Sequence, residues 1–251
     1  MVRGLYIAGT GMMLQRRKME AVTHNVVNAD TTGFKKEFLV SHTFDSVLAR
    51  RINDAPHAFT NRAIGPMNLG TQVDQFYIDF SNGSFEGTER PTDIAIQGDV
   101  FFVIGTADGE RYTRNGAFYL DNNGFLVDGQ GNFLLGEAGP INVGGLDFRV
   151  DSFGNVFNAE GFLDTIRVAS FEDNQTLRKQ GDNLFFATVP PLAEPHPFAL
   201  AQGFLEASNV DIGREMVDMI TVFRAYETNQ RMITMIDETV GRAVNEIGRL
   251  R

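Results

Sequence analysis

The stretch Met219–Leu250, MITVFRAYETNQRMITMIDETVGRAVNEIGRL, carries the most regular pattern in the chain. Its apolar residues recur at alternating steps of three and four, which is typical of one face of a long helix or of a coiled-coil seam. No proline follows Pro197, so nothing interrupts the pattern. We therefore predict a long C-terminal helix within residues 201–251. Its stripe comprises Met219, Val222, Tyr226, Asn229, Ile233, Ile236, Val240, Ala243, Ile247 and Leu250.

A shorter version of the same pattern opens the chain. Glycines at positions 4, 9 and 11 each cost about 1 kcal/mol of helix propensity relative to alanine. A helix with three such residues needs a packing partner to be stable in water. We predict an N-terminal helix within residues 1–33. Its stripe comprises Leu5, Ala8, Met12, Gln15, Met19, Val22, Val26 and Ala29.

The two predicted helices are natural partners, because the termini of a domain often lie close together and both stripes have the coiled-coil period. An antiparallel pairing with Ala29 near Glu215 brings Gln15 to face Asn229. A polar residue on each helix at matching depth fixes the register at some cost in stability. The alternative is that both segments are ordinary core helices of one globule.

The middle of the chain changes character. Short runs rich in aromatic and β-branched residues, such as residues 100–104 and 184–189, alternate with Asp/Asn-Gly turn signals such as residues 121–124 and 128–131. Closely spaced strands joined in this way indicate antiparallel hairpins rather than βαβ units. We predict an α+β protein: a coiled-coil stem made of the two terminal helices, an extended connector over residues 34–69, and a central antiparallel all-β domain over residues 70–200.

The charge is distributed unevenly along the 251 residues. Residues 1–36 have a net charge of +4, residues 37–209 of −13 and residues 210–251 of −1, which gives −10 for the whole chain. An acidic protein is poorly suited to nucleic acid. The absence of cysteine excludes disulfides, a thiol nucleophile and Cys-ligated zinc. No convincing signal peptide opens the sequence, so we expect a cytoplasmic protein or one exported without cleavage.

The sequence contains no recognisable catalytic or metal-binding motif. A calcium loop starting at Asp121 would need a bidentate glutamate at its twelfth position, where Asn132 stands. The four histidines are scattered, and no phosphate-binding loop or nucleophile elbow occurs. We therefore expect no catalytic residues, no metal ligands and no cofactor.

Four blocks of sequence carry a resemblance to a known family. They are residues 25–35 (NVVNADTTGFK), residues 83–103 around PTDIAIQG, residues 112–118 (YTRNGAF), and residues 202–229, which contain QGFLEASNV and RAYETN. In this order the chain resembles the bacterial flagellar rod and hook (axial) proteins, most closely the basal-body rod members. Position in the proximal or the distal rod stays open, because different blocks resemble each.

The resemblance implies a non-catalytic structural subunit that polymerises through its terminal helices into the helical drive shaft that transmits torque to the hook. It implies export through the flagellar type III apparatus without a cleaved signal peptide, and a location in the basal body outside the cytoplasmic membrane. The implied partners are copies of the chain and other axial subunits, with no nucleic acid and no small-molecule substrate. The alternatives are an exported β-sandwich binding module or glycan-acting enzyme with accessory helices, and a cytoplasmic coiled-coil adaptor.

The candidate assembly residues lie on the two stripes and at the end of the first helix. Gly33, following two β-branched threonines, is expected to stop that helix, and Phe34 to anchor the departing chain. On this interpretation Gly33→Val harms assembly more than the β domain. The full set is Leu5, Met12, Gln15, Met19, Val22, Val26, Asn28, Gly33, Phe34, Met219, Val222, Tyr226, Asn229, Ile233, Ile236, Val240 and Ile247.

Overall fold

The computed structural model describes residues 2–50, 63–159 and 161–248, and the chain divides into two compact units. Unit 1 combines Met1–Val26, Glu37–Tyr77 and Ile212–Arg251. Unit 2 combines Val27–Lys36 and Ile78–Asp211. The chain therefore passes from unit 1 to unit 2 after the first helix, returns, and passes again before and after the long middle segment.

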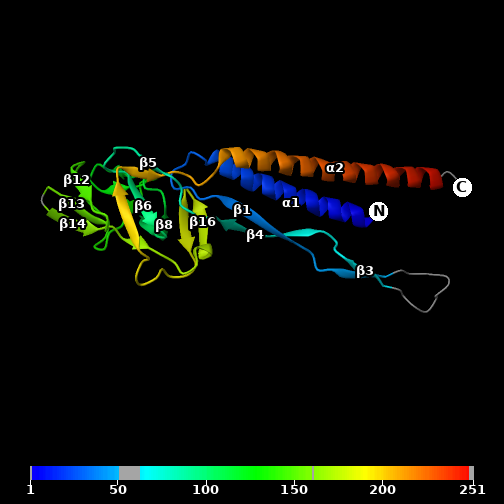
Figure 1. Ribbon diagram of the computed structural model, residues 1–251, viewed down its shortest axis with the longest axis horizontal. Helices are drawn as coiled ribbons and strands as arrows, with labels where there is room; N and C mark the ends of the chain where they lie inside the picture. The colour runs from blue at the N-terminus through cyan, green and yellow to red at the C-terminus, as the bar shows by residue number, and fades with distance from the viewer. Residues whose placement is uncertain (1, 51–62, 160, 249–251) are drawn as a thin grey trace. The chain divides into compact units, whose positions relative to one another are not determined.

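Two antiparallel helices form one part of unit 1. Helix α1 spans Val2–Val27 and helix α2 spans Ile212–Gly248. Figure 1 shows them side by side, with the N-terminal end of α1 beside the C-terminal half of α2. Helix α1 ends at Val27, six residues before the predicted end at residue 33. The turn that follows is held by a hydrogen bond from the Thr31 amide to the Asn28 carbonyl, 3.1 Å long.

Strands form the other part of unit 1. Strand β1 (Glu37–Thr43) pairs with β4 (Thr71–Ile78), and β2 (Val47–Arg50) pairs antiparallel with β3 (Ala63–Met67). The described part of the segment expected to be an extended connector, residues 34–50 and 63–69, thus contains three strands. Residues 51–62 of that segment lie outside the described residues.

Unit 2 is built from antiparallel strands, as the turn signals predict. An eight-stranded sheet has the order β16-β17-β8-β7-β11-β10-β9, with β15 also paired to β7. These strands span Phe101–Thr106 (β7), Gly109–Thr113 (β8), Tyr119–Leu120 (β9), Leu126–Val127 (β10), Phe133–Leu134 (β11), Val168–Ala169 (β15), Leu177–Gly181 (β16) and Leu184–Ala187 (β17). A 3₁₀ turn, η1, covers Asn174–Thr176.

Three smaller sheets complete unit 2. One is three-stranded, with β13 between β12 and β14, and the other two are the pairs β5–β19 and β6–β18. Because β18 and β19 follow residue 197, the β structure continues to residue 206, beyond the predicted boundary at 200. The strands span Phe85–Gly87 (β5), Ile94–Gly98 (β6), Phe148–Val150 (β12), Asn155–Asn158 (β13), Gly161–Thr165 (β14), Phe198–Gln202 (β18) and Phe204–Glu206 (β19).

The predicted Asp-Gly segments are hairpin turns. Residues 121–124 connect β9 to β10, and residues 128–131 connect β10 to β11. The Asp128 carboxylate accepts the backbone amides of Gln130 and Asn132 at 2.8 and 2.9 Å. A carboxylate engaged in this way closes its own turn.

Strand β7 lies between two hydrophobic clusters. Phe102 and Ile104 belong to one cluster, with Ile94, Phe118 and Val156 among its other members. Phe101 and Val103 point the other way, into a cluster with Tyr112 and Phe185. Successive side chains of a strand face opposite sides of the sheet, so a strand buried on both faces reads as a continuous apolar run.

Candidate functional site

The segment that leaves α1 is docked onto unit 2 through Gly33. Its φ is +66°, a left-handed conformation that favours glycine, and its amide donates to the Glu206 carbonyl at 2.7 Å. A Cβ atom here would lie 2.5 Å from the carbonyl carbon and oxygen of Arg114. Gly33 therefore permits close packing against unit 2. It does not stop the helix, which has already ended at Val27, and its contact with Arg114 indicates that Gly33→Val harms unit 2 itself.

Phe34 anchors the same segment, as predicted. Its side chain is 3% exposed, and the Lys179 ammonium lies 4.1 Å from the centre of its ring. Lys179 also donates to the carbonyl of Lys35 at 2.8 Å. A cation over an aromatic face adds electrostatic attraction to the burial of the ring.

Three charged side chains are buried next to this segment. Lys35 Nζ lies 2.7 Å from Glu206 Oε1, and Arg114 Nη1 lies 3.5 Å from Glu206 Oε2. All three side chains are at most 1% exposed. We call Lys35, Arg114 and Glu206 the charge cluster.

Hydrogen bonds to the surrounding backbone also hold the charge cluster in place. Lys35 Nζ donates to the Ser81 carbonyl at 2.8 Å, Arg114 Nη2 donates to the Gly98 carbonyl at 2.7 Å, and Glu206 Oε1 accepts the Gly83 amide at 3.0 Å. Burial lowers the pKa of Lys35 and of Arg114, while attraction to Glu206 opposes the shift in both. Buried charges with this many partners define one arrangement of the segments that carry them.

Asn209 ties the segment that leads into α2 to the segment that leaves α1. Its Oδ1 accepts the Lys36 amide at 2.8 Å, and its Nδ2 donates to the carbonyls of Asp79 and Ser81 at 2.8 and 3.1 Å. The Asp79 amide in turn donates to the Lys36 carbonyl at 2.8 Å. Three distant parts of the sequence, near residues 35, 80 and 207, are therefore joined within unit 2.

Asn25 makes an equivalent junction within unit 1. Its side chain accepts the Glu37 amide at 2.9 Å, and donates to the Glu37 carbonyl at 2.8 Å and to Glu215 Oε2 at 3.2 Å. Asn25 and Glu215 are each 1% exposed. The end of α1, the start of β1 and the first turn of α2 thus meet at one buried amide.

The helix pair has a register that differs by one turn from the predicted one. Asn25, rather than Ala29, reaches Glu215. A Cβ on Gly11 would lie 3.1 Å from the Asn229 amide nitrogen, so Asn229 faces Gly11 rather than Gln15. Gly4 and Gly11 both lie against α2 and let the helices approach closely, which favours this register over the predicted Gln15–Asn229 pairing.

The predicted stripes coincide with the partly buried faces of the two helices. Leu5 and Val240 are exceptions at 44% and 37% exposed, the side chain of Ile247 is not described, and Leu250 lies outside the described residues. Asn28, in the turn after α1, is half-buried. The half-buried stripe residues are Met12, Gln15, Met19, Val22 and Val26 in α1, and Met219, Val222, Tyr226, Asn229, Ile233 and Ile236 in α2.

Helix α1 has a second packed face that the stripe did not include. Leu14 and Ala21 are 7% and 5% exposed. The side chain of Thr10 approaches Gly70, where a Cβ would lie 2.4 Å from its Oγ1, so α1 also packs on the strands of unit 1. A helix contacted on two sides has apolar residues around more of its circumference than one stripe describes.

The residues of the charge cluster were not identified as site residues from the sequence, although each lies in one of the quoted blocks. The sequence feature that could have identified them is their position: Lys35 follows Gly33 and Phe34, and Glu206 precedes Asn209. A charged residue in a turn is usually solvated, and no local pattern reveals that two such residues pair over 171 positions.

Comparison with known proteins assigns these same segments to one family. Three family models match: one described as flagella basal body rod protein over residues 5–35, one as the flagellar hook protein FlgE/F/G D1 domain over residues 95–181, and one as flagellar basal body rod FlgEFG protein C-terminal over residues 201–246. The flagellar basal-body rod protein FlgG of Bacillus subtilis is 34% identical over 266 residues, 98% of this chain and 99% of its own. The chain belongs to the flagellar basal-body rod protein family.

Other rod relatives match over their whole length. The flagellar hook-basal body complex protein FlhO of Bacillus subtilis is 31% identical over 270 residues, and the rod protein FlgF of Caulobacter vibrioides is 31% identical over 262 residues; each match covers 100% of both chains. These relatives are structural proteins and not enzymes, and the chain is likewise a structural rod subunit. Within its described residues, no helix is long and apolar enough to cross a membrane.

Proposed function

We propose that this rod protein polymerises through its terminal helices into the helical drive shaft of the flagellar basal body. Its place in the basal body and its association with other rod and hook subunits follow from the family. The finer proposal is that α1 and α2 form a coiled-coil stem whose packed helices give the shaft its stiffness. Two observations support a coiled-coil stem: α1 and α2 contact each other in antiparallel orientation, and the predicted stripes lie on their half-buried faces.

The observation that carries the proposal is the apolar surface that the paired helices still expose. In α1, Tyr6, Ile7 and Met13 are 53%, 42% and 62% exposed; in α2, Val217 and Ile220 are 63% and 54% exposed. Burial of apolar surface is favourable by about 25 cal/mol per Å². Large apolar patches on a soluble protein mark sites of association.

The route to the basal body is also part of the proposal. We propose export through the flagellar type III apparatus without a cleaved signal peptide; Val2–Val27 form α1, which contributes to the helix pair. The proposed partners are copies of this chain and neighbouring axial subunits. We propose that nucleic acid, small-molecule substrates, metals and cofactors are not among its binding partners.

A matched pair of variants tests polymerisation through the helices. Ile236→Asp places a charge on the half-buried stripe, next to Gly4 of α1. Thr239→Asp places the same charge at an exposed position three residues further along α2. Electron microscopy of the purified full-length chain should show filaments for the unmodified protein and for Thr239→Asp, but none for Ile236→Asp. Filaments formed equally by both variants would refute a role for the helix pair.

A further inference from the structure

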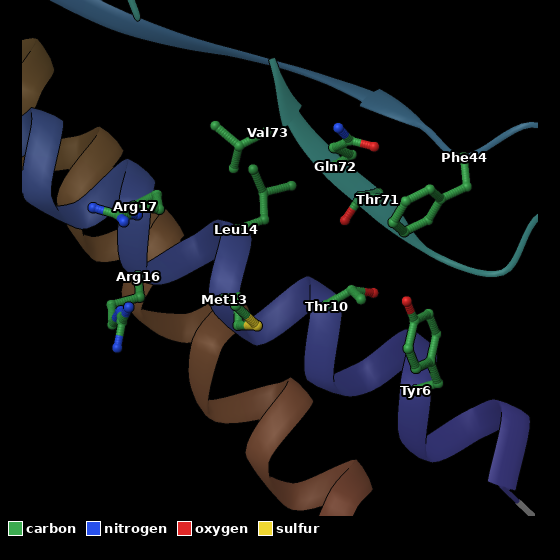
Figure 2. A pocket seen from close by; sticks show the side chains of 10 residues that line it. All are labelled: Tyr6, Thr10, Met13, Leu14, Arg16, Arg17, Phe44, Thr71, Gln72 and Val73. Carbon is green, nitrogen blue, oxygen red and sulfur yellow. The ribbon is translucent and has the colours of Figure 1, made fainter. Parts of the chain in front are cut away.

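An open groove of about 450 Å³ runs along α1 on the side that faces the strands of unit 1. Figure 2 shows Tyr6, Met13 and Leu14 of α1 lining it together with Phe44 and Val73 from the strand side. Tyr6 and Phe44 form an aromatic pair with ring centres 6.4 Å apart. The groove is therefore mostly apolar although it is open to solvent.

Helix α2 carries a second apolar stripe, and this one is exposed. Ile212, Met216, Ile220 and Phe223 follow one another at steps of four, four and three, and are 42% to 54% exposed. This spacing places them on one face of the helix, beside the half-buried seam that faces α1. We call these four exposed residues the α2 stripe; they are different residues from the half-buried predicted stripe that begins at Met219.

The groove and the α2 stripe match in length. The α1 side of the groove runs from Tyr6 to Arg17, twelve residues whose ends lie about 16 Å apart along the helix. The α2 stripe runs from Ile212 to Phe223, also twelve residues. The two surfaces can therefore cover each other along their whole length when two helices lie side by side.

Their own chain cannot bring them together. The contacts of Asn25 with Glu215 and of Gly11 with Asn229 place the α2 stripe beside residues 17–28 of α1. Bringing it to the groove requires a shift of eleven residues, about 16 Å along the helix. The α2 stripe that fills the groove must belong to another molecule.

At one end, the charges of the two surfaces are complementary in one orientation. In an assembly built by repeating one screw operation, with the helices along the screw axis, a neighbour's α2 keeps its direction and runs antiparallel to α1. Phe223 then meets the Tyr6–Phe44 pair, and Glu227, one turn further on, meets Arg3, one turn before Tyr6. Within its own chain Glu227 has a weak exposed pair with Arg231, at 3.9 Å.

The other end of the groove carries Arg16 and Arg17, which both pair with Glu20 of the same helix, at 3.6 and 2.9 Å. One carboxylate offsets only one of these two positive charges, so this end of the groove keeps a net positive charge. Both arginine side chains are more than half exposed, so Ile212 meets their alkyl stems while the guanidinium groups stay in water.

We propose that the groove along α1 receives the α2 stripe of a second copy of this chain. This inference rests on the proposed polymerisation and names its mating surfaces. Because the groove and the stripe are different surfaces of one molecule, the contact is head-to-tail and does not close on itself by pairing. Such a contact produces an open polymer rather than a symmetric dimer.

Disulfide crosslinking tests the contact, since the native chain contains no cysteine. Met13→Cys with Met216→Cys substitutes two exposed residues, 62% and 53% exposed, that meet in the proposed contact. Within one chain they are about 16 Å apart along the helix pair, beyond the 7 Å that a disulfide spans between Cα atoms. The matched control pairs Met13→Cys with Met235→Cys, which lies on α2 at 52% exposed but away from the stripe.

Oxidation under conditions in which the unmodified chain forms filaments should give a ladder of oligomers for the 13/216 variant. The 13/235 control should give none, and an equal mixture of the Met13→Cys and Met216→Cys single variants should give only dimers. Filaments without a ladder would overturn this contact and leave the proposed function standing. Dimers from either single variant alone would show a symmetric contact and also overturn it. If the unmodified chain forms no filaments, both proposals fail.

Discussion

Removal of the Glu206 carboxylate is the perturbation whose effect the structure defines most sharply. In Glu206→Leu, Lys35 and Arg114 keep their buried positions but lose the carboxylate they share, at 2.7 and 3.5 Å. Breaking a buried ion pair by removing one partner costs about 3–5 kcal/mol, because a buried charge is left uncompensated. The matched control is Glu86→Leu, an exposed carboxylate on the neighbouring strand β5, which should cost less than about 0.5 kcal/mol.

The double variant Lys35→Met/Glu206→Leu separates pairing from general damage. Lys35→Met alone leaves Glu206 with Arg114 and the Gly83 amide, and should cost about 3 kcal/mol. In the double variant Glu206→Leu leaves no buried lysine without its carboxylate. The loss in free energy of unfolding should therefore be about 2–3 kcal/mol smaller than the sum of the two single losses.

Urea unfolding followed by near-ultraviolet circular dichroism of the tyrosines and phenylalanines in unit 2 measures these costs. A loss of about 4 kcal/mol shifts the urea midpoint by about 2 M when the slope is about 2 kcal/mol per M. A loss below about 1 kcal/mol for Glu206→Leu, or strict additivity in the double variant, would show that the charge cluster does not join these segments.

Three further substitutions have defined outcomes. Gly33→Ala should destabilise unit 2 by more than Gly144→Ala in the same urea assay, since both have φ near +70° but only Gly33 would clash, with the Arg114 backbone. Gly144→Ala should cost about 1 kcal/mol, and equal losses would refute the close approach. Burial raises the pKa of Tyr112, so this tyrosine ionises at lower pH in the unfolded chain, and the free energy of unfolding falls as pH rises above 10. Tyr112→Phe should make this fall less steep. An unchanged dependence of the free energy of unfolding on pH would contradict the burial effect. Asn25→Ala removes three hydrogen bonds and should lower the free energy of unfolding by about 2 kcal/mol. Hydrogen exchange at the Glu37 backbone amide should become faster. Unchanged protection of that amide would argue against the junction.

The helices and the antiparallel character of the middle segment could be predicted because both depend on local periodicity. Three-four spacing identified the face of α2 that contains Val222, Tyr226 and Ile233, and Asp-Gly turns identified the hairpins of unit 2. These patterns repeat within a few residues, so a single sequence carries them in full.

The junction and the register could not be predicted because they depend on contacts between distant residues. Gly33 looked like a helix stop because glycine both ends helices and permits close approach, and only its contact with Arg114 distinguishes the two. The glycines at positions 4 and 11 looked like weaknesses in a helix. In the fold they are the points where α2 comes closest, which moves the register by one turn.

The central claim is that the apolar surface left exposed on α1 and α2 is covered by other copies of the chain. Sedimentation velocity of the purified full-length protein over a wide concentration range tests it most directly. The average mass should grow continuously with concentration, without stopping at a dimer, while Ile236→Asp should stay monomeric. A chain that sediments as a monomer at every concentration, with both helices fully protected from hydrogen exchange, would contradict it.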